Sequence, residues 1–484
     1  MTRLSRRTLL SGLAALAATP AVARAPELSL RPLARGEAPP QPASPPATSL
    51  IRAAGIGGAV GYLVVNAETG QVVEAHNPTL RLPPASVTKA ATAYFALSRL
   101  GVSHRFRTRL VATGPVEDGI LKGDLILQGG GDPNLDTDGL ADMVTRLRTL
   151  GVHKVDGAFR VDASALPTVP FIDPDQPVQV GYNPAVSGLN LNFNRVHFEW
   201  KRAGTGYNVT MQARAVRNRP DVAIARMAIE DRAQPVYTYT AAGGVDRWSV
   251  AKRYLGQGGA RWLPVKRPVD YAAEVFVTLA NSQGLNLTRE ADVDGVEGEA
   301  LVTHSSAGLS DMLRAMLKYS TNLTAEAVGL AAAQAGGTSP TSLIRSAREM
   351  NLWYNREIGC HSTGFVDHSG LGYGSRVSAA DMVHILQTAQ NSAVLPTLLK
   401  PFNVENKAIK VMAKTGTLNF VSALAGYIKA PGTPDLIFAI FTADMPRRDA
   451  IPISQRERPS GAKSWSNRSR GLQRQLIRRW VTVA

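Results

Sequence analysis

Cysteine is almost absent from this chain: Cys360 is the single example among 484 residues. One cysteine cannot form an intramolecular disulfide, and it cannot build the cysteine clusters that hold structural metals. We interpret Cys360 as a small buried apolar residue rather than a reactive thiol. The eight histidines are scattered, and none stands in an HExxH or similar ligand spacing. We therefore expect no metal site and no cofactor.

Acidic residues are also scarce, because 38 Asp and Glu stand against 54 Lys and Arg, a formal net charge of +16. Residues 1–25 hold four arginines and no acid, so removing them would lower this charge from +16 to +12. Such a surface attracts nucleic acid, membrane headgroups or an acidic polymer, and charge alone does not choose among them. With 44% apolar and 19% charged residues, the composition is that of a soluble globular protein.

The N-terminal apolar run is too short to cross a bilayer. It extends from Leu9 to Ala18, whereas a spanning helix needs roughly 20 residues. Arg6 and Arg7 precede it, and small residues up to Ala25 offer cleavage sites. Residues 1–25 are therefore predicted to be an export signal, which resembles a twin-arginine signal; an ordinary secretory signal is the alternative. Both place the mature protein in the periplasm.

Export also bears on the meaning of the positive charge. An exported protein meets cell-wall polymer and membrane surface far more often than nucleic acid. We therefore interpret the charge as affinity for the wall or as peripheral membrane contact, and we expect no nucleic-acid partner. Since no cysteine follows the apolar run, a lipoprotein anchor is excluded.

A proline-rich stretch separates the export signal from the folded body. Residues 26–49 include five prolines between positions 39 and 46, which is typical of an extended, semi-rigid spacer. The folded body is expected to begin near Leu50, with a hairpin formed by residues 61–65 and 71–74. A helix is expected over residues 85–100, where apolar residues recur at helical spacing.

The middle of the chain differs in character from both ends. Over residues 106–297, short strand-like runs and turns dominate, and Gly, Asp and Pro breakers are frequent. The runs Leu121–Leu127 and Ala272–Leu279 are predicted to be strands. We expect two nested strand-rich domains here, inserted into a catalytic domain formed by residues 50–105 and 298–484.

Helices and buried strands alternate in the C-terminal part. Helices are expected over residues 310–319 and 325–335, and buried strands over 408–412 and 436–442. A final helix over residues 470–481 would place its apolar residues on one face.

The tail from Arg447 to Ala484 is strongly basic, with ten Arg or Lys against Asp449 and Glu457. A solvated helix face explains most of this charge, and a wall-binding patch is the alternative.

The first motif is Ser86-Val87-Thr88-Lys89, at the start of a predicted helix. Three residues apart on a helix, Ser86 and Lys89 share a face and can form a hydrogen bond. A seryl oxygen is a poor nucleophile until a base takes its proton. A lysine can be that base if burial and nearby positive charge lower its pKa. Alone, this spacing is a weak signal.

The second motif is Ser320-Thr321-Asn322, at the break between two predicted helices. A hydroxyl there can relay a proton, and a carboxamide can hold a peptide-like substrate and also fix the lysine. Ser and Asn also cap helices for purely structural reasons, so this motif too is weak alone.

The third motif is Lys414-Thr415-Gly416-Thr417, placed directly after an apolar strand. An ammonium, a hydroxyl and a residue without a side chain let a substrate backbone lie along a strand edge. The ammonium and hydroxyl can then hold a terminal carboxylate.

Together and in this order, SxxK, SxN and KTG are the motifs of penicillin-binding proteins and serine β-lactamases, and the chain resembles that superfamily. Ser320 lies 234 positions after Ser86, far more than a β-lactamase places there. This spacing is similar to the D-alanyl-D-alanine carboxypeptidase/endopeptidase branch, whose members insert two extra domains. The resemblance covers nearly everything after residue 50. It implies an α/β (α+β) transpeptidase-like domain with inserted strand-rich domains.

The resemblance also implies roles for the catalytic residues. Ser86 would be the acylated nucleophile and Lys89 its general base, while Ser320 relays protons and Asn322 positions the substrate. The substrates would be D-Ala-D-Ala stem peptides of peptidoglycan, and penicillins and other β-lactams would trap the acyl-enzyme.

The third motif would bind substrate. Lys414 and Thr415 would hold its terminal carboxylate, and Gly416 would leave room for its backbone. The backbone N–H groups of Ser86 and Thr417 would form the oxyanion hole.

One loop departs from the family pattern. The family usually has Asp-Gly-Ser-Gly where this chain has Asp367-His368-Ser369-Gly370. In relatives this loop lies near the substrate, so we expect it to affect substrate preference. His368 is interpreted as a tolerated loop residue, with tuning of the site edge as the alternative.

Three other functions compete with this interpretation. A β-lactamase or esterase would use the same three motifs, but the long insert argues against it. A wall-binding scaffold with a silent site is opposed by the presence of every expected catalytic side chain. A nucleic-acid binder has only the charge in its favour. The balance between carboxypeptidase and endopeptidase activity stays open.

Overall fold

The computed structural model describes residues 45–484, so the predicted export signal and most of the predicted spacer lie outside the described residues. Residues 46–484 form one compact unit. Its first element is helix α2 (Ala47–Ala54), which begins directly after Pro46. The spacer prediction is therefore too long at this end. Proline is accepted at a helix start, and burial of Ala47 holds the first turn in place.

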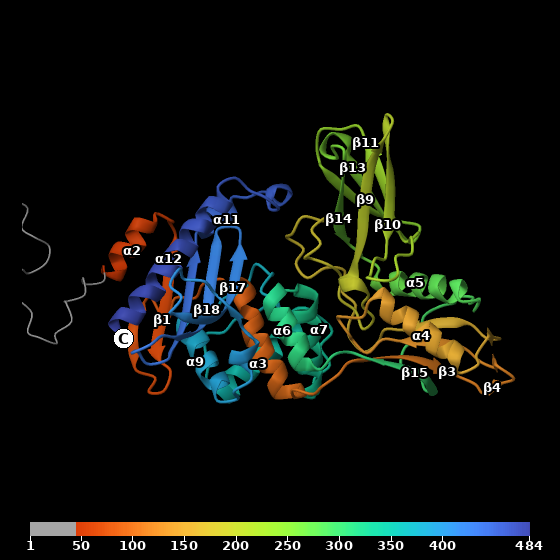
Figure 1. Cartoon of the computed structure of the whole chain (residues 1–484), viewed down its shortest axis with the longest axis horizontal. Helices are drawn as coiled ribbons and strands as arrows, with labels where there is room; N and C mark the ends of the chain where they lie inside the picture. The colour runs from red at the N-terminus through yellow and green to blue at the C-terminus, as the bar shows by residue number, and fades with distance from the viewer. Residues whose placement is uncertain (1–44) are drawn as a thin grey trace, which may run out of the picture. The chain divides into compact units, whose positions relative to one another are not determined.

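A six-stranded antiparallel sheet is the centre of the catalytic part (Figure 1). Its strand order is β16-β17-β18-β19-β1-β2, so the chain's first two strands close one edge. The predicted hairpin is present as β1 and β2. The predicted strand over 436–442 falls within β19, whereas the one over 408–412 overlaps β17, which begins two residues later. The strands are β1 (Ala59–Asn66), β2 (Val72–His76), β16 (Lys400–Pro401), β17 (Lys410–Leu418), β18 (Val421–Lys429) and β19 (Leu436–Ala443).

Helices cover both faces of this sheet. On one face α2 packs beside α12 (Ala462–Val483), as Figure 1 shows, and their apolar residues form one core with the sheet. On the other face a larger core includes the helix that follows Ser86. The helical elements of the catalytic part are η1 (Ala85–Val87), α3 (Thr88–Leu100), α6 (Leu309–Tyr319), α7 (Asn322–Ala335), α8 (Leu343–Trp353), η4 (Tyr354–Ile358), α9 (Ala379–Gln390), α10 (Leu395–Leu398), α11 (Met445–Asp449) and η5 (Ile453–Gln455).

The final helix confirms the predicted apolar face but is longer than expected. The predicted apolar face is buried, and it consists of Leu472, Leu476, Ile477 and Trp480. The helix begins already at Ala462, after Gly461 in a left-handed conformation, because Trp465 adds another buried turn.

The inserted part contains four small sheets in the described residues. One is four-stranded and carries α4 (Thr137–Thr149) and α5 (Pro268–Ser282) beside it; two three-stranded sheets lie between β8 and α5 in sequence. The strands are β3 (Arg107–Ala112), β4 (Val116–Glu117), β5 (Ile120–Leu121), β6 (Leu125–Gln128), β7 (Lys154–Val155), β8 (Phe159–Asp162), β9 (Arg195–Ala203), β10 (Gly206–Gln212), β11 (Ala225–Glu230), β12 (Tyr237–Ala242), β13 (Val245–Ala251), β14 (Gly258–Pro264) and β15 (Glu299–Ser305), with short helices η2 (Asn192–Asn194) and η3 (Lys252–Tyr254).

The predicted strand Ala272–Leu279 is wrong, because these residues form the middle of helix α5. The run is short, apolar and rich in β-branched residues, so it suits a buried strand as well as a buried helix. In the fold, Tyr271, Val275 and Leu279 repeat at helical spacing and are buried, and Pro268 starts the helix.

Two other predictions for the insert need correction. Leu121–Leu127 is not one strand, since β5 and β6 are separated by a turn at Gly123. The insert also continues past residue 297, because β15 pairs with β3 in the insert's four-stranded sheet. A boundary drawn from local composition cannot detect this pairing across nearly 200 positions of sequence.

Candidate active site

The structure brings together the serine and lysine of the first motif. Ser86 lies in η1, at the start of α3, and is partly exposed, whereas Lys89 one turn later is fully buried. The Lys89 ammonium donates hydrogen bonds to Ser86 Oγ at 3.1 Å, to Asn322 Oδ1 at 2.7 Å and to the Ser369 carbonyl at 2.7 Å. The geometry of a nucleophile held against its base is therefore present.

Burial lowers the pKa of Lys89 to about 8, while the carboxyl groups of Asp367 and Glu326 oppose this shift. Burial is the cause that the sequence analysis expected, and the charged neighbours that influence this pKa most are acidic. With a pKa near 8, about a tenth of the lysine is unprotonated at pH 7 and can accept a proton.

Two buried carboxyl groups that the sequence analysis missed support the lysine. Glu326 accepts backbone N–H hydrogen bonds from His368 at 3.0 Å and Ser369 at 2.8 Å. Asp367 accepts backbone N–H hydrogen bonds from Gly370 and Gly372. Burial, followed by the charge of Asp367, raises the pKa of Glu326 to about 8. The two carboxyl groups hold the turn whose Ser369 carbonyl receives Lys89.

A sequence signal for Glu326 existed. It stands four residues after Asn322, on the same face of a helix, inside an otherwise apolar run. An acid in such a run is rarely buried without a partner.

The second motif joins two helices, as expected. Ser320 ends α6 in a left-handed conformation with φ 60°, and Asn322 is the first residue of α7. The Asn322 side chain accepts from Lys89 and donates to the Tyr182 carbonyl of the insert at 2.8 Å. Ser320 Oγ instead accepts from Lys414 Nζ at 3.0 Å. The structure thus pairs Ser320 with Lys414 rather than with Lys89.

The third motif lies inside β17 and not after it, which corrects the predicted strand end. β16 pairs only with Met412 and Ala413, so the edge of β17 beyond Ala413 has no strand partner among residues 45–484. Thr415 is partly exposed and Thr417 is exposed on this stretch. An open edge of this kind can accept an extended peptide as a further strand.

Lys414 is buried beside the first lysine. Its ammonium donates to Ser320 Oγ and to the Thr415 carbonyl, and its side chain is 1% exposed. Burial, followed by repulsion from the Lys89 ammonium, lowers the pKa of Lys414 well below its ordinary value. Both lysines of the site are therefore tuned toward proton transfer.

Gly416 is required by the close approach of β17 to η1. A Cβ atom at this position would lie 2.5 Å from the Pro84 carbonyl oxygen and 3.1 Å from the side chain of Ala85. Ala85 itself has φ 47°, a left-handed conformation that is uncommon for alanine. The turn that carries Ser86 and strand β17 therefore pack in direct backbone contact, which a side chain at position 416 would prevent.

The prediction that His368 is a tolerated loop residue is wrong. Its ring is fully buried, stacks on Phe95 and shares a hydrogen bond of 2.7 Å with Ser346 Oγ. Gly329 of α7 leaves the space for this ring. Burial lowers the pKa of His368 to about 3, so the ring is neutral. Whether a loop residue points inward depends on packing, which the local sequence does not reveal.

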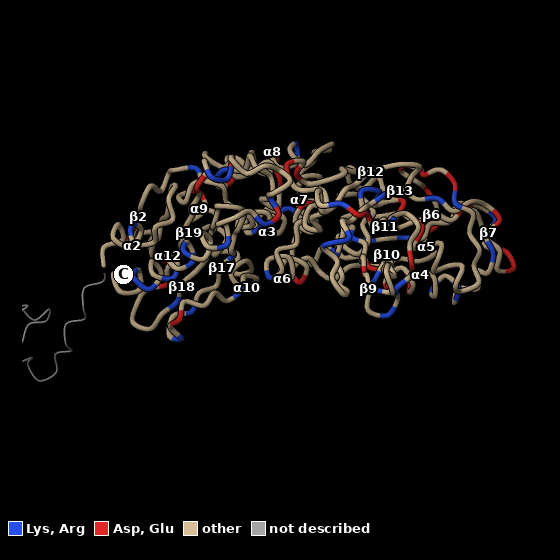
Figure 2. Tube along the Cα trace, turned by 90° about the horizontal axis from the view of Figure 1, so that it is seen from above, with Lys and Arg blue, Asp and Glu red and all other residues tan. Residues whose placement is uncertain are grey.

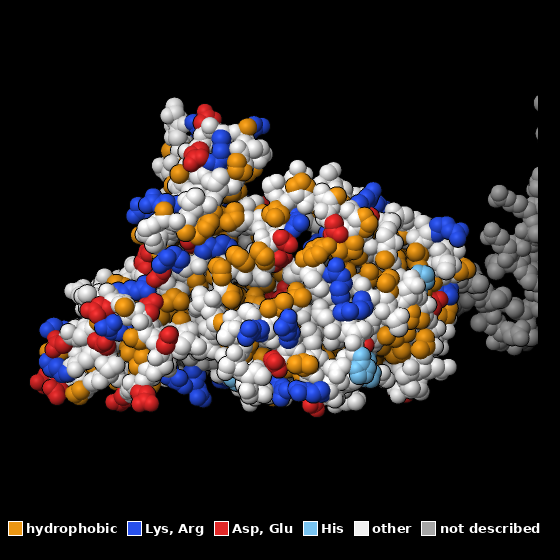
Figure 3. Space-filling model, turned by 180° about the vertical axis from the view of Figure 1, so that it is seen from behind, with side chains coloured by type: hydrophobic (Ala, Val, Ile, Leu, Met, Phe, Trp, Pro, Cys, Tyr) orange, Lys and Arg blue, Asp and Glu red, His pale blue; other side chains and the backbone are white. Residues whose placement is uncertain are grey.

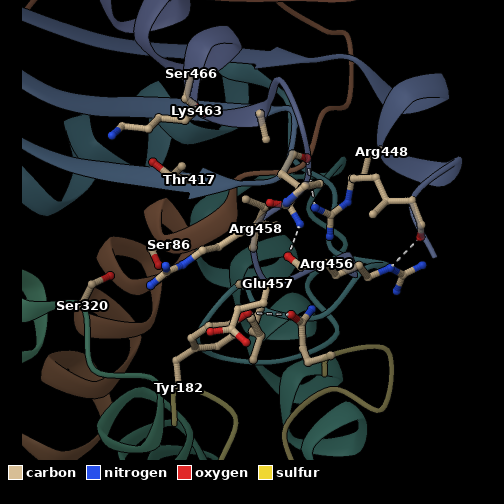
Figure 4. Close-up of a pocket in the computed structure, with 18 of the residues that line it drawn as sticks. Ser86, Tyr182, Ser320, Thr417, Arg448, Arg456, Glu457, Arg458, Lys463 and Ser466 are labelled. Carbon is tan, nitrogen blue, oxygen red and sulfur yellow. Dashed lines mark hydrogen bonds between the residues drawn. The ribbon is translucent and has the colours of Figure 1, made fainter. Parts of the chain in front are cut away.

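The cleft above Ser86 has a volume of about 790 Å³. Ser86, Ser320, Asn322 and Thr417 line one side of it. Residues of the segment from Arg448 to Ser466 also line it, and Figure 4 shows Arg458 near Ser86 and Lys463 near Thr417. Residues from all three motifs therefore face one cavity.

Comparison with known proteins agrees with this geometry. The model of the D-Ala-D-Ala carboxypeptidase 3 (S13) family matches residues 49–458. The D-alanyl-D-alanine carboxypeptidase of Actinomadura sp. (strain R39) is 28% identical, over 84% of this chain and 84% of that protein.

The fold is similar to that of penicillin binding protein 4 from Haemophilus influenzae, with a TM-score of 0.72 and 22% identity over 90% of this chain and 98% of the other. A structure of the same protein with a novel β-lactam has a TM-score of 0.70 at 21% identity, with the same coverage. The fold class inferred from the motifs is therefore confirmed. Since the family model covers most of the chain, the protein belongs to the D-Ala-D-Ala carboxypeptidase 3 (S13) family of serine hydrolases.

Proposed function

We propose that the protein hydrolyses D-Ala-D-Ala stem peptides of peptidoglycan through a serine acyl-enzyme, as a carboxypeptidase or endopeptidase. One observation carries this proposal: Lys89 is fully buried, has a lowered pKa and lies 3.1 Å from Ser86 Oγ. A seryl oxygen with an unprotonated amine at this distance can attack a peptide carbonyl.

In the acylation step, unprotonated Lys89 accepts the proton of Ser86 Oγ as that oxygen bonds to the carbonyl carbon. The negative charge on the carbonyl oxygen would be held by the backbone N–H groups of Ser86 and Thr417. The C–N bond then breaks, and Ser320, held by Lys414, gives the leaving amine its proton. Lys414 re-protonates Ser320.

Before deacylation, Lys89 passes the proton taken from Ser86 to Lys414, which has just given one up, so both lysines recover their starting charge. In deacylation, water attacks the acyl carbon and loses a proton to Lys89. The ester bond to Ser86 breaks, and Lys89 gives that proton to Ser86 Oγ. This releases the shortened peptide and regenerates the seryl hydroxyl. A β-lactam would acylate Ser86 in the same way, but its opened ring would stay attached and block that water.

Substrate would lie along the open edge of β17. Thr415 and Lys414 would bind its terminal carboxylate, and Asn322 would bind its amide. Gly416 would act on this edge indirectly, because the absence of a Cβ atom lets β17 lie against the turn that carries Ser86.

We also propose that the enzyme works in the periplasm, with peripheral contact to wall or membrane. The sequence of residues 1–25 supports export. Among residues 45–484, every helix is too short or too polar to span a bilayer.

Labelling with a fluorescent penicillin tests the acyl-enzyme. We expect stable labelling that peptide mass mapping locates at Ser86, and no labelling of Ser86→Ala. Rapid turnover of nitrocefin would instead indicate a β-lactamase. Absence of labelling in the folded wild-type protein would indicate a silent scaffold.

Digestion of purified wall fragments separates the two peptidase activities. Loss of terminal D-Ala, read by mass, would show carboxypeptidase activity, and conversion of cross-linked dimers to monomers would show endopeptidase activity. If neither product forms with labelled enzyme, the proposed substrate is wrong.

A further inference from the structure

The lining of the cleft is strongly basic. We call its five basic residues the cationic rim; the only acid lining the cleft among the described residues is Glu457. The rim comprises Arg448, Arg456, Arg458, Lys463 and Arg470.

The charge of the rim is only partly neutralised by the protein. Arg456 lies 3.8 Å from Asp175, and Glu457 is paired with Arg261 of the insert at 2.9 Å. Arg448 is buried, and its guanidinium lies over the Tyr373 ring. Arg458, Lys463 and Arg470 are exposed, and none of these three has an ion pair within residues 45–484. Uncompensated charges of one sign in a cleft attract an ion of the opposite sign.

Basic residues do not gather in this way on the face drawn in Figure 3, where they are scattered among apolar and uncharged side chains. Basic and acidic residues are interspersed along the inserted part (Figure 2). All five rim residues come from the basic tail Arg447–Ala484, so the rim is the part of that tail that lines the cleft.

The position of the rim indicates which part of a substrate it meets. If the terminal carboxylate lies at Lys414 and Thr415, the upstream part of the peptide extends toward the other end of β17. There Leu418 and Asn419 line the cleft, and Asn419 is hydrogen bonded to residues of the rim. In Figure 4 the Arg458 side chain extends across the cleft toward Ser86. Arg470 also donates to Thr417 Oγ1 at 3.4 Å.

We propose that the cationic rim binds a carboxylate carried by the upstream, acyl-side part of the substrate, so that the enzyme prefers acidic stem peptides. This inference rests on the proposed function, because it takes the direction of the bound peptide from it. Guanidinium groups suit this task, since they hold a carboxylate through paired hydrogen bonds.

Two peptides that differ only in this charge test the proposal. N-acetylated glutamyl-D-Ala-D-Ala and glutaminyl-D-Ala-D-Ala have nearly the same shape, and release of D-Ala from each gives kcat/KM. We expect the acidic peptide to be favoured on the order of tenfold at low salt. The preference should shrink as ionic strength rises, because Arg458, Lys463 and Arg470 are exposed.

Variants locate the effect. In the triple variant Arg458→Gln, Lys463→Gln, Arg470→Gln, the ratio of the two kcat/KM values should fall toward one. Arg468→Gln is the matched control: Arg468 is exposed on the same helix but does not line the cleft, so the ratio should stay at the wild-type value. Arg458→Gln alone should lower the ratio in part, and it guards against a folding defect of the triple variant.

Equal kcat/KM values for the two peptides in the wild-type enzyme would overturn the inference. So would a triple variant that slows both peptides equally, because the rim would then act on the terminal carboxylate common to both. Penicillin labelling of Ser86 in the same samples distinguishes failure of the rim proposal from failure of the proposed function. Labelling without charge preference rejects only the rim proposal, whereas no labelling rejects the proposed function.

Discussion

The active site has two groups of basic side chains: two lysines buried behind the cleft wall, and the cationic rim that lines the cleft. Lys89 and Lys414 are 0% and 1% exposed, and burial is the largest cause of the fall in the pKa of each. Arg458 and Lys463 of the rim are exposed. Burial therefore turns lysine into a group that can exchange protons near neutral pH, while exposed rim residues keep a fixed charge.

The contacts that hold the two groups in place also differ in how exposed they are. The inner lysines are fixed by buried hydrogen bonds to Asn322, Ser369 and Ser320. The rim is tied to the insert through the partly exposed pair Glu457–Arg261. A change on the inner side should therefore have large effects, and the equivalent change on the rim small ones.

Replacement of a lysine by alanine should show the largest contrast in acylation rate between the inner lysines and the rim. Lys89→Ala removes the general base, and we expect acylation by a fluorescent penicillin to slow by about 10³-fold. Lys463→Ala, the same change on the rim, should slow it by less than about tenfold. Stopped-flow labelling rates measure both, with circular dichroism as a check on folding. Similar losses in the two variants would contradict the comparison.

A methyl group added at a glycine should change the free energy of unfolding in opposite directions in β17 and in α12. Gly416→Ala places a Cβ atom against the Pro84 carbonyl, and we expect a loss of about 1–3 kcal/mol in the free energy of unfolding. Gly471→Ala, on α12, meets no atom within 4 Å and should gain about 0.5–1 kcal/mol, because alanine favours a helix. Urea denaturation measures both; a stable Gly416→Ala variant would show that β17 and η1 can move apart.

Removal of the buried acid should alter the pH dependence. Wild-type acylation should rise with pH with a midpoint near 8, because Lys89 must lose its proton to act as base. The Glu326 carboxyl raises the pKa of Lys89, so Glu326→Gln should move this midpoint to lower pH.

Glu326→Ala should also slow acylation about tenfold, since the turn that holds Ser369 loses two hydrogen bonds, and Glu326→Gln should recover part of the rate. An unchanged pH midpoint in Glu326→Gln would mean that the acid is only structural.

The smallest effect is expected for the ion pair between the rim and the insert. Glu457→Gln should lower the free energy of unfolding by less than about 1 kcal/mol, because both partners are about a quarter exposed. Thermal and urea denaturation at low and high salt would check this. A larger loss would mean that this contact holds the insert in place.

Much of the site could be predicted because its residues lie in short local motifs. Ser86 and Lys89 are one helical turn apart, so their contact follows from helix geometry. The place of Ser320 between two helices also followed from local patterns. The part that failed was the surroundings: Glu326, the inward direction of His368 and the pairing of Ser320 with Lys414 depend on which elements pack together.

The insert shows the same division. Its strand-rich character was visible in its breakers, but Ala272–Leu279 proved to be a helix, and β15 joined a sheet begun almost 200 positions earlier. A mainly apolar run of eight residues suits either element, and the residues packed around it decide between strand and helix.

The sequence by itself determined the chemistry: a serine, two lysines, a carboxamide and a glycine in three spaced motifs, within a basic chain. Only the tertiary structure decided their pKa values and their contacts. Burial and distance set both, and these arise when remote segments pack together. The depth that separates the two inner lysines from the rim is a property of that packing.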